Sequence, residues 1–266
     1  MSVVERDDGA EIWWEVGGPE GAPAVALVMG LGYPAAMWWR QIPAITSRYR
    51  VVLIDNRGAG HTGDVRGAPY TIETMAEDVV AVLEAADVKK VHLVGLSMGG
   101  MIAQELALTR PELVQSLVLM ATHPGIRHAT FEPEALSLVQ ARQAMTAREA
   151  AEAAIAFNYA KTTPRALIEE DWDLRLPLAS SPAGYTAQMM GGLHWSSLDR
   201  LPLLEPPLLV LHGADDRLVP AVNGQRIANA VPGSAHIELA DANHILTTDK
   251  ADEVNDLLLA WFDKHP

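Results

Sequence analysis

A serine among glycines is the residue of this sequence best suited to nucleophilic chemistry. Residues 95–100 (GLSMGG) follow the apolar run 91–94 and open a segment of helical periodicity. This is the pattern G-x-S-x-G on a strand-to-helix turn, where small neighbours permit a strained backbone that lifts the Ser97 hydroxyl above the sheet. The turn also places the Met98 N–H at a helix N-terminus, where it can stabilise an oxyanion. An incidental serine in a glycine-rich turn is the alternative, and the strand-turn-helix context argues against it.

A serine hydroxyl needs a general base, and the base needs an acid that orients it. Asp215 and Asp216 follow the apolar run 208–212, and His244 follows the strand-like segment 235–239. All of these residues, like Ser97, fall just beyond a predicted strand, so parallel strands would bring them to one edge of a sheet. Order and spacing alone do not separate Asp215 from Asp216. His212, which ends a predicted core strand, is expected to be structural.

The elements that must position these residues alternate along the chain. Nearly continuous apolar runs predict buried strands at 25–29, 51–55, 91–95, 117–120 and 208–212. Apolar residues spaced three and four apart predict helices over 71–86, 98–109 and 251–262. Such alternation is typical of a mostly parallel sheet covered by helices on both faces. Residues 122–197 contain no convincing strand, and we interpret them as a helical insertion.

Composition excludes several classes of protein. The 266 residues are 49% hydrophobic, which suits a full core and is too apolar for disorder. The absence of cysteine excludes a disulfide scaffold, a thiolate metal site and a cysteine nucleophile. A net charge of −14 argues against binding of nucleic acid. We expect a cytoplasmic protein without membrane contact, because no secretory signal precedes the chain and glycine and proline interrupt its longest uncharged run.

The chain resembles the α/β-hydrolases, in particular the capped kind that includes 3-oxoadipate enol-lactonases, small carboxylesterases and cofactor-free haloperoxidases. The likeness covers essentially the whole length and includes the chain order Ser97, aspartate, His244. The family pattern G-x-x-D-x-x-x-P matches Gly213, Asp216 and Pro220, so the resemblance selects Asp216 as the acid. A second family signature, D-x-R-G-x-G-x-S/T, matches residues 55–62 (DNRGAGHT), and its usual role is structural.

The resemblance also implies a division of the chain and a second oxyanion donor. It predicts a core of residues 1–121 and 198–266 with a helical cap, residues 122–197, inserted after the sixth strand. The oxyanion hole would consist of the backbone N–H groups of Met98 and Leu31. Where the family often has His-Gly, this chain has Met29-Gly30. Because a backbone group is the donor, that change leaves the donor itself in place.

Substrate preference is predicted to depend on the cap and on the loop beyond the oxyanion hole. Methionine and aromatic side chains form adaptable apolar walls. The candidate substrate-binding residues are Gly30, Gly32, Tyr33, Trp38, Trp172, Met189, Met190, His194, Trp195 and Leu218. Any one of the large side chains could instead pack the cap onto the core. Arg127, Arg142 and Arg175 are candidates for binding a substrate carboxylate, although arginines on helices are more often solvated.

The predicted reaction is the hydrolysis of a small, fairly apolar ester or lactone, with water as co-substrate. His244 would take the proton of Ser97, and Asp216 would hold the imidazole tautomer. Two other reactions fit the same triad, namely hydrolysis of a carbon–carbon bond and perhydrolysis or haloperoxidation without a cofactor. Removal of an N-terminal residue from a peptide and signal binding by a vestigial triad are further alternatives. The sequence leaves the oligomeric state open.

No cofactor and no metal is expected. The sequence contains neither a phosphate-binding G-x-x-x-x-G-K-[ST] loop nor a G-x-G-x-x-G dinucleotide fingerprint. His123 and His128 are five residues apart, without an H-E-x-x-H motif or an acidic cluster beside them. The expected partner is therefore a small-molecule substrate alone.

Overall fold

The centre of the protein is an eight-stranded sheet, described here from a computed structural model that covers residues 2–65, 67 and 70–266. The strand order is β1-β2-β4-β3-β5-β6-β7-β8. Neighbouring strands from β4 to β8 are parallel, whereas β1 and β2 pair antiparallel with their neighbours. The strands are β1 (Ser2–Glu5), β2 (Glu11–Gly17), β3 (Ala24–Val28), β4 (Arg50–Ile54), β5 (Val91–Leu96), β6 (Val114–Met120), β7 (Leu208–Gly213) and β8 (Ala235–Leu239).

The central strands are the ones that hydrophobicity alone predicts. Every residue of β3, β5 and β7 is buried, as expected of strands covered on both faces. The sequence analysis did not predict β1 and β2. β1 is largely exposed, and in β2 Glu11 and Glu15 enclose an apolar stretch of only three residues, so neither strand forms a long apolar run.

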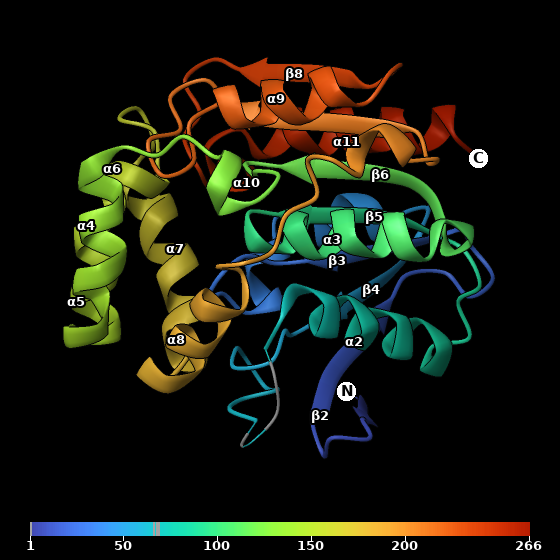
Figure 1. The fold of residues 1–266 in the computed structure, drawn as a ribbon, viewed down its shortest axis with the longest axis horizontal. Coiled ribbons are helices and arrows are strands. Elements are labelled where there is room, and N and C mark those ends of the chain that lie inside the picture. The colour runs from blue at the N-terminus through green and yellow to red at the C-terminus, as the bar shows by residue number, and fades with distance from the viewer. Residues whose placement is uncertain (1, 66, 68–69) are drawn as a thin grey trace.

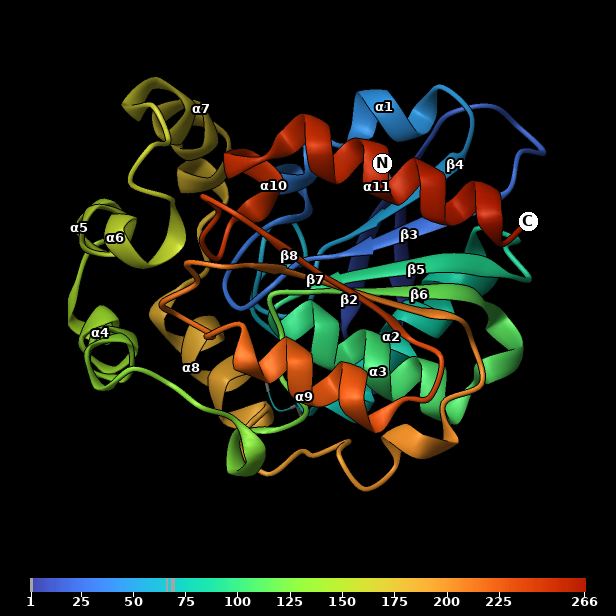
Figure 2. The same ribbon diagram turned by 90° about the horizontal axis from the view of Figure 1, so that it is seen from above.

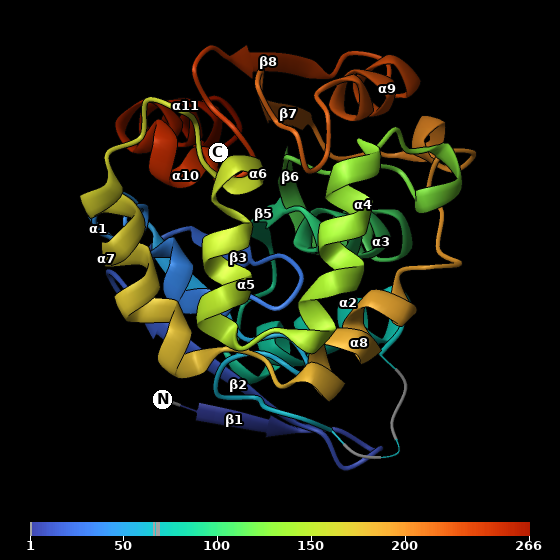
Figure 3. The same cartoon turned by 90° about the vertical axis from the view of Figure 1, so that its left-hand side faces the viewer.

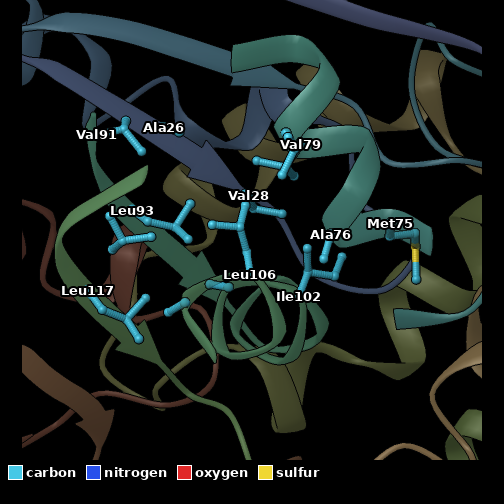
Figure 4. Close-up of a cluster of buried hydrophobic side chains, with 14 of the residues drawn as sticks. Ala26, Val28, Met75, Ala76, Val79, Val91, Leu93, Ile102, Leu106 and Leu117 are labelled. Atoms are coloured by element: carbon cyan, nitrogen blue, oxygen red, sulfur yellow. The ribbon is translucent and has the colours of Figure 1, made fainter. Parts of the chain in front are cut away.

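Helices cover both faces of the sheet, as predicted (Figure 2). One face carries α1 (Ile42–Thr46) and α11 (Ala251–Lys264), and the other carries α2 (Ile72–Ala85), α3 (Met98–Thr109) and α9 (Val222–Ala230). Each face has its own cluster of buried apolar side chains. Figure 4 shows one of them, in which Val28 and Leu93 of the sheet point toward Ile102 and Leu106 of α3. The Thr71 hydroxyl caps α2 by accepting from the Thr74 N–H at 3.1 Å.

Between β6 and β7 every element of the described chain is a helix, which confirms a helical insertion after the sixth strand. The insertion contains the cap helices, α4 (Pro133–Ala141), α5 (Ala147–Ala153), α6 (Ile155–Asn158), α7 (Arg165–Arg175) and α8 (Pro182–Gly191). These helices lie together beyond one end of the sheet (Figures 1 and 3). The Ser197 N–H donates to the Pro124 carbonyl at 3.1 Å, so the ends of the predicted cap segment lie side by side. The boundaries 122–197 stay a prediction.

The remaining helical elements are short. They are η1 (Ala35–Trp38), η2 (Pro111–Leu113), η3 (Ile126–His128), η4 (Arg142–Ala144), η5 (Leu176–Leu178), η6 (Leu201–Leu203) and α10 (Leu246–Asp249). Within the described part of the chain, no helix combines the length and the apolar character needed to cross a membrane.

Candidate active site

Ser97 occupies a strained turn between β5 and α3. Its backbone has φ 57° and ψ −120°, a conformation that residues other than glycine rarely adopt. The flanking glycines make the turn possible. A Cβ on Gly99 would lie 2.1 Å from the Val28 carbonyl oxygen, and one on Gly95 would lie 2.3 Å from the Gly99 oxygen. The pattern G-x-S-x-G therefore reflects backbone contacts that leave no room for side chains.

Hydrogen bonds to the neighbouring strand hold this turn in place. The Ser97 N–H donates to the Met120 carbonyl at 2.8 Å, and the Thr122 hydroxyl donates to the Ser97 carbonyl at 2.7 Å. Both partners come from the carboxyl end of β6 or the residues just after it. The surrounding structure thus fixes a conformation that the serine would not adopt by itself.

The carboxylate of Asp216 lies beside the imidazole of His244. His244 Nδ1 donates to Asp216 Oδ2 at 2.9 Å, while Asp216 Oδ1 accepts the N–H groups of Leu218 at 2.9 Å and Val219 at 2.8 Å. Burial would raise the pKa of Asp216, but the His244 charge and hydrogen bonds from His212 and His244 hold this pKa below its usual value. Asp215 is exposed. Of the two candidate aspartates, Asp216 is therefore the one that lies against His244.

His212 supports the Asp216 loop from within the core. Its Nε2 donates to the Val219 carbonyl at 2.7 Å and lies 3.4 Å from Asp216 Oδ2. A Cβ on Gly224 would lie only 2.4 Å from His212 Nδ1, so α9 packs directly on the ring. These contacts fit the structural role expected of this histidine.

Ser97 and His244 line the same cavity, which has a volume of about 180 Å³. With its Nδ1 hydrogen directed at Asp216, the neutral ring of His244 presents Nε2 as an acceptor. This is the tautomer that a general base for serine requires. The loop at Gly30 also approaches the serine, because a Cβ at Gly30 would lie 2.9 Å from Ser97 Cβ.

The two predicted oxyanion donors belong to the residues that directly follow Gly30 and Ser97 in the chain. Met98 is the first residue of α3, so its N–H has no acceptor within the helix. Leu31 follows Gly30 in a turn closed by the Tyr33 N–H, which donates to the Gly30 carbonyl at 3.2 Å. Both Leu31 and Met98 line the cavity.

Gln188 of the cap forms a hydrogen bond to the loop of residues 30–33, the Leu31 loop. Its Oε1 accepts the Gly32 N–H at 2.7 Å, and its Nε2 donates to the Arg57 carbonyl. The side chain is fully buried and lines the cavity. One cap residue thereby connects α8 to two core loops, one of which carries the predicted oxyanion donor.

The D-x-R-G-x-G-x-T segment stabilises the neighbouring loops and does not line the cavity. Asp55 is buried and accepts the N–H groups of Ala35 at 2.6 Å and His61 at 2.8 Å. Arg57 is paired with Asp78 of α2. The segment therefore performs the structural role that its charged residues indicate.

Only some of the predicted substrate-binding residues lie at the cavity. Gly30, Tyr33, Met189 and Leu218 line it. The structure places Trp38, Trp172 and Trp195 in the core instead. Trp172 is fully buried with the Arg148 and Arg165 guanidinium groups 4.5 Å from its ring, and Trp195 donates from Nε1 to Glu105 Oε2 at 2.7 Å.

The other three lie elsewhere. Met190 and His194 are exposed and do not line the cavity, because they lie off the inner face of α8 or beyond its end. Gly32 lines a second cavity. Its N–H donates to Gln188, and its Cα faces the Tyr185 ring. Size and hydrophobicity alone do not distinguish a pocket wall from core packing.

Two cap helices contribute wall residues that the sequence analysis did not identify. Ala135, Leu136 and Val139 come from α4, and Tyr185, Gln188 and Gly192 come from α8 and its end, beside the predicted Met189. Within each helix these residues recur at spacings of three and four, so each set forms one face. This spacing could have indicated which face of each helix lines the cavity. It becomes informative only once the opposite face of the same helix is known to be exposed to solvent.

His123 is a further wall residue that the sequence analysis considered only as a metal ligand. Its Nδ1 accepts the Gly125 N–H at 3.1 Å. Burial and the nearby His244 and His212 lower the pKa of His123 to about 4, so its ring is neutral at pH 7. Across the described residues, no group of three or more histidine and carboxylate side chains is arranged to hold a metal ion.

Comparison with known proteins identifies the class to which this fold and site belong. The family model described as "alpha/beta hydrolase fold" matches residues 23–251. The chain belongs to the α/β-hydrolase family, which confirms the resemblance inferred from its motifs.

Individual relatives agree with this assignment. A Mycobacterium tuberculosis protein named "Putative non-heme bromoperoxidase BpoC" is 31% identical over 246 residues, 90% of this chain and 93% of the relative. A malate-bound thermophilic esterase from Thermogutta terrifontis superposes with a TM-score of 0.86 over the full length of both chains at 26% identity. A hydrolase from Pseudomonas aeruginosa PA01 gives a TM-score of 0.84 at 28% identity, over 98% of this chain and 97% of its own.

Proposed function

We propose that this protein is a serine hydrolase that cleaves a small, fairly apolar carboxylic ester or lactone through an acyl-enzyme. One observation carries the proposal: a buried carboxylate, Asp216, fixes the tautomer of His244, and His244 shares a cavity with a serine on a strained turn. A vestigial site would have no need of the strain at Ser97 or of the buried charge at Asp216.

Each step of the reaction has a group in the structure. His244 Nε2 takes the hydroxyl proton as Ser97 attacks the carbonyl carbon, and the N–H groups of Met98 and Leu31 donate hydrogen bonds to the resulting oxyanion. His244 then returns the proton to the departing alcohol. Water attacks the acyl-enzyme with His244 again as base, which regenerates Ser97 and releases the acid.

The cavity wall supports an apolar acyl group. Methionine side chains of Met98, Met101 and Met189 face the cavity together with Leu136 and Leu218. The volume of about 180 Å³ suits a short acyl chain. Each buried methylene contributes about 0.8 kcal/mol, so kcat/KM should rise about fourfold per added carbon until the cavity is full.

Active-site titration and an acyl-chain series test the proposal together. A fluorophosphonate is expected to label one serine, Ser97, with loss of all esterase activity. p-Nitrophenyl esters of increasing acyl length, assayed beside a lactone panel, should give rising and then falling kcat/KM. A protein that is folded but is not labelled at Ser97, or whose hydrolysis survives labelling, would refute the proposed mechanism.

Perhydrolysis is a second candidate because of the name that the 31% identical relative bears. Hydrogen peroxide in place of water would attack the same acyl-enzyme and release a peracid. Peracid formation from acetate or an acetate ester, measured with increasing peroxide, separates the two reactions. Water remains the preferred nucleophile if peroxide leaves the rate of acid release unchanged and no peracid forms.

Loss of Gln188 is expected to impair turnover through the Leu31 loop. In Gln188→Met the Gly32 N–H and the Arg57 carbonyl lose their buried partner, so the loop no longer holds the oxyanion donor in position. We expect kcat to fall about tenfold with little change in KM, because a displaced donor weakens the transition state more than the bound ester. Ester kinetics of this variant measure the split.

A glutamine of the same cap provides the control for this variant. Gln140 is exposed on α4 and does not line the cavity, so Gln140→Met should match the wild type. A Gln188→Met protein with unchanged kcat, or with a raised KM alone, would show that Gln188 does not position the oxyanion hole.

A further inference from the structure

A second cavity, of about 300 Å³, lies beside the catalytic cavity where α5, α7 and α8 meet. We call it the Arg175 cavity, and the lining residues used below are Gly32, Arg142, Arg175, Ser180 and Tyr185. Arg142 and Tyr185 line both cavities, so the two adjoin. Figure 3 looks onto the cap helices that surround this region. Gly32 directly follows Leu31, the predicted oxyanion donor, and places the Arg175 cavity next to the reaction site.

Arg175 is a buried cation without an anionic partner among the described residues. The residue is 6% exposed, and its Nε and Nη2 have no hydrogen-bond acceptor from the protein. The guanidinium carbon lies 4.6 Å from the centre of the Tyr33 ring. Buried guanidinium groups in folded proteins are normally paired, since removing the charge from water is costly. An aromatic face offsets only part of this cost.

Other unsatisfied donors line the same cavity. Ser180 Oγ is buried and has no protein partner, and the buried Tyr185 Oη has only the guanidinium of Arg142, a donor, beside it, so neither hydroxyl has an acceptor. Burial raises the pKa of Tyr185, so its hydroxyl keeps its proton and can donate. The Arg142 guanidinium lies 4.7 Å from the centre of the Tyr185 ring and adds a second positive charge. No aspartate or glutamate is among the described residues that line the cavity.

We propose that the Arg175 cavity binds a carboxylate, and that this carboxylate is the distal group of a substrate whose ester or lactone lies at Ser97. Guanidinium groups bind carboxylates through charge-assisted, often bidentate hydrogen bonds, and the serine and tyrosine hydroxyls satisfy the remaining lone pairs. The inference rests on the proposed function for the ester end of the molecule, but the carboxylate site stands on its own donors.

The net charge of −14 opposes an anionic substrate only at a distance. Charges on the surface are screened beyond about 10 Å at moderate salt. The charged side chains that line the Arg175 cavity are the two guanidinium groups, so the lining favours an anion. The apolar cavity at Ser97 and the cationic cavity beside it together fit the half-ester of a dicarboxylic acid.

Pairs of matched esters test the proposal. Mono-p-nitrophenyl esters of linear dicarboxylic acids of increasing length are compared with uncharged esters in which an isopropyl group replaces the free carboxylate. At the best length, the wild type should favour the half-ester by about tenfold or more in kcat/KM. Arg175→Met should lose this preference while it retains activity on the uncharged ester. Arg142→Met, whose side chain also lines the catalytic cavity, should lower the ratio of half-ester to uncharged-ester kcat/KM.

Arg148→Met is the matched control. Arg148 lies exposed on α5 and lines neither cavity, yet its loss changes the net charge by the same amount. This variant should keep the half-ester preference. Because Arg175 is buried, its replacement could prevent folding, and Arg142→Met, at a partly exposed position, then provides the same comparison.

A binding measurement separates this inference from the proposed reaction. Calorimetric titration of Ser97→Ala with glutarate reports the carboxylate site without turnover. Glutarate binding that both arginine variants weaken supports the carboxylate site even if no ester is hydrolysed. If this binding occurs without a half-ester preference, the bound carboxylate is a separate ligand and not part of the substrate. The carboxylate site is overturned if there is neither a half-ester preference nor glutarate binding, or if neither variant changes the binding. The proposed hydrolase function would still stand in that case, provided that uncharged esters are hydrolysed in a Ser97-dependent manner.

Discussion

Ser97→Ala is expected to lower kcat for ester hydrolysis by about 10⁴-fold to 10⁶-fold. The variant keeps the cavity and the N–H groups of Leu31 and Met98 but has no atom that can form the acyl-enzyme. A residual rate above the uncatalysed one would come from those donors acting on a water-mediated reaction. Steady-state and single-turnover assays with the best p-nitrophenyl ester measure the loss.

Removal of the serine should also stabilise the fold. The Ser97 backbone, at φ 57° and ψ −120°, lies in a region that favours glycine, and its side chain makes no capping hydrogen bond to α3. Ser97→Gly should therefore raise the free energy of unfolding by about 1–3 kcal/mol while it abolishes activity. Chemical denaturation of the wild type, Ser97→Ala and Ser97→Gly measures this difference.

A serine outside the site serves as the control. Ser137 is exposed on α4, so Ser137→Ala should leave the activity unchanged. Full esterase activity in Ser97→Ala would refute the nucleophile assignment. A Ser97→Gly protein less stable than the wild type would show that the turn is not a source of strain.

That Ser97, His244 and one of the two aspartates lie at the same edge of the sheet could be predicted because each follows a strand of a parallel sheet. The carboxyl ends of parallel strands share one edge, so chain order determines which loops meet there. Burial on both faces makes those strands continuous apolar runs, which hydrophobicity detects. Choosing Asp216 over Asp215 required the family pattern, since one residue along a loop changes whether a carboxylate is buried against His244 or exposed.

The cavity wall was predictable only in part, for a physical reason. A tryptophan gains as much by packing in the core as by lining a pocket, and Trp38 and Trp172 are fully buried in the core. The wall is formed by whichever helix face turns inward, which depends on the packing of α4 and α8. Arg175 illustrates the same point, because its sequence neighbours do not reveal that its guanidinium is buried.

The second large effect is expected at Asp216, where Asp216→Asn should reduce kcat by about 10⁴-fold. The asparagine keeps nearly the same shape, and its carbonyl can still accept the N–H groups of Leu218 and Val219. Its amide would then present an N–H to His244 Nδ1, which in the wild type is a donor. The ring must adopt the other tautomer, with a proton on Nε2, and it can no longer accept the proton of Ser97.

A matched variant and the pH dependence of stability complete the test. Asp215→Asn makes the same chemical change at an exposed neighbour and should retain activity. Because the folded protein lowers the pKa of Asp216, the carboxylate stabilises the fold above the ordinary aspartate pKa, and this contribution is lost as the pH falls through the folded-state value. Asp216→Asn should therefore be less stable than the wild type at pH 7, with a difference that shrinks in acid. Equal activity of the wild type and Asp216→Asn would show that Asp216 is not the acid of the triad. Loss of activity in Asp215→Asn instead would show the same.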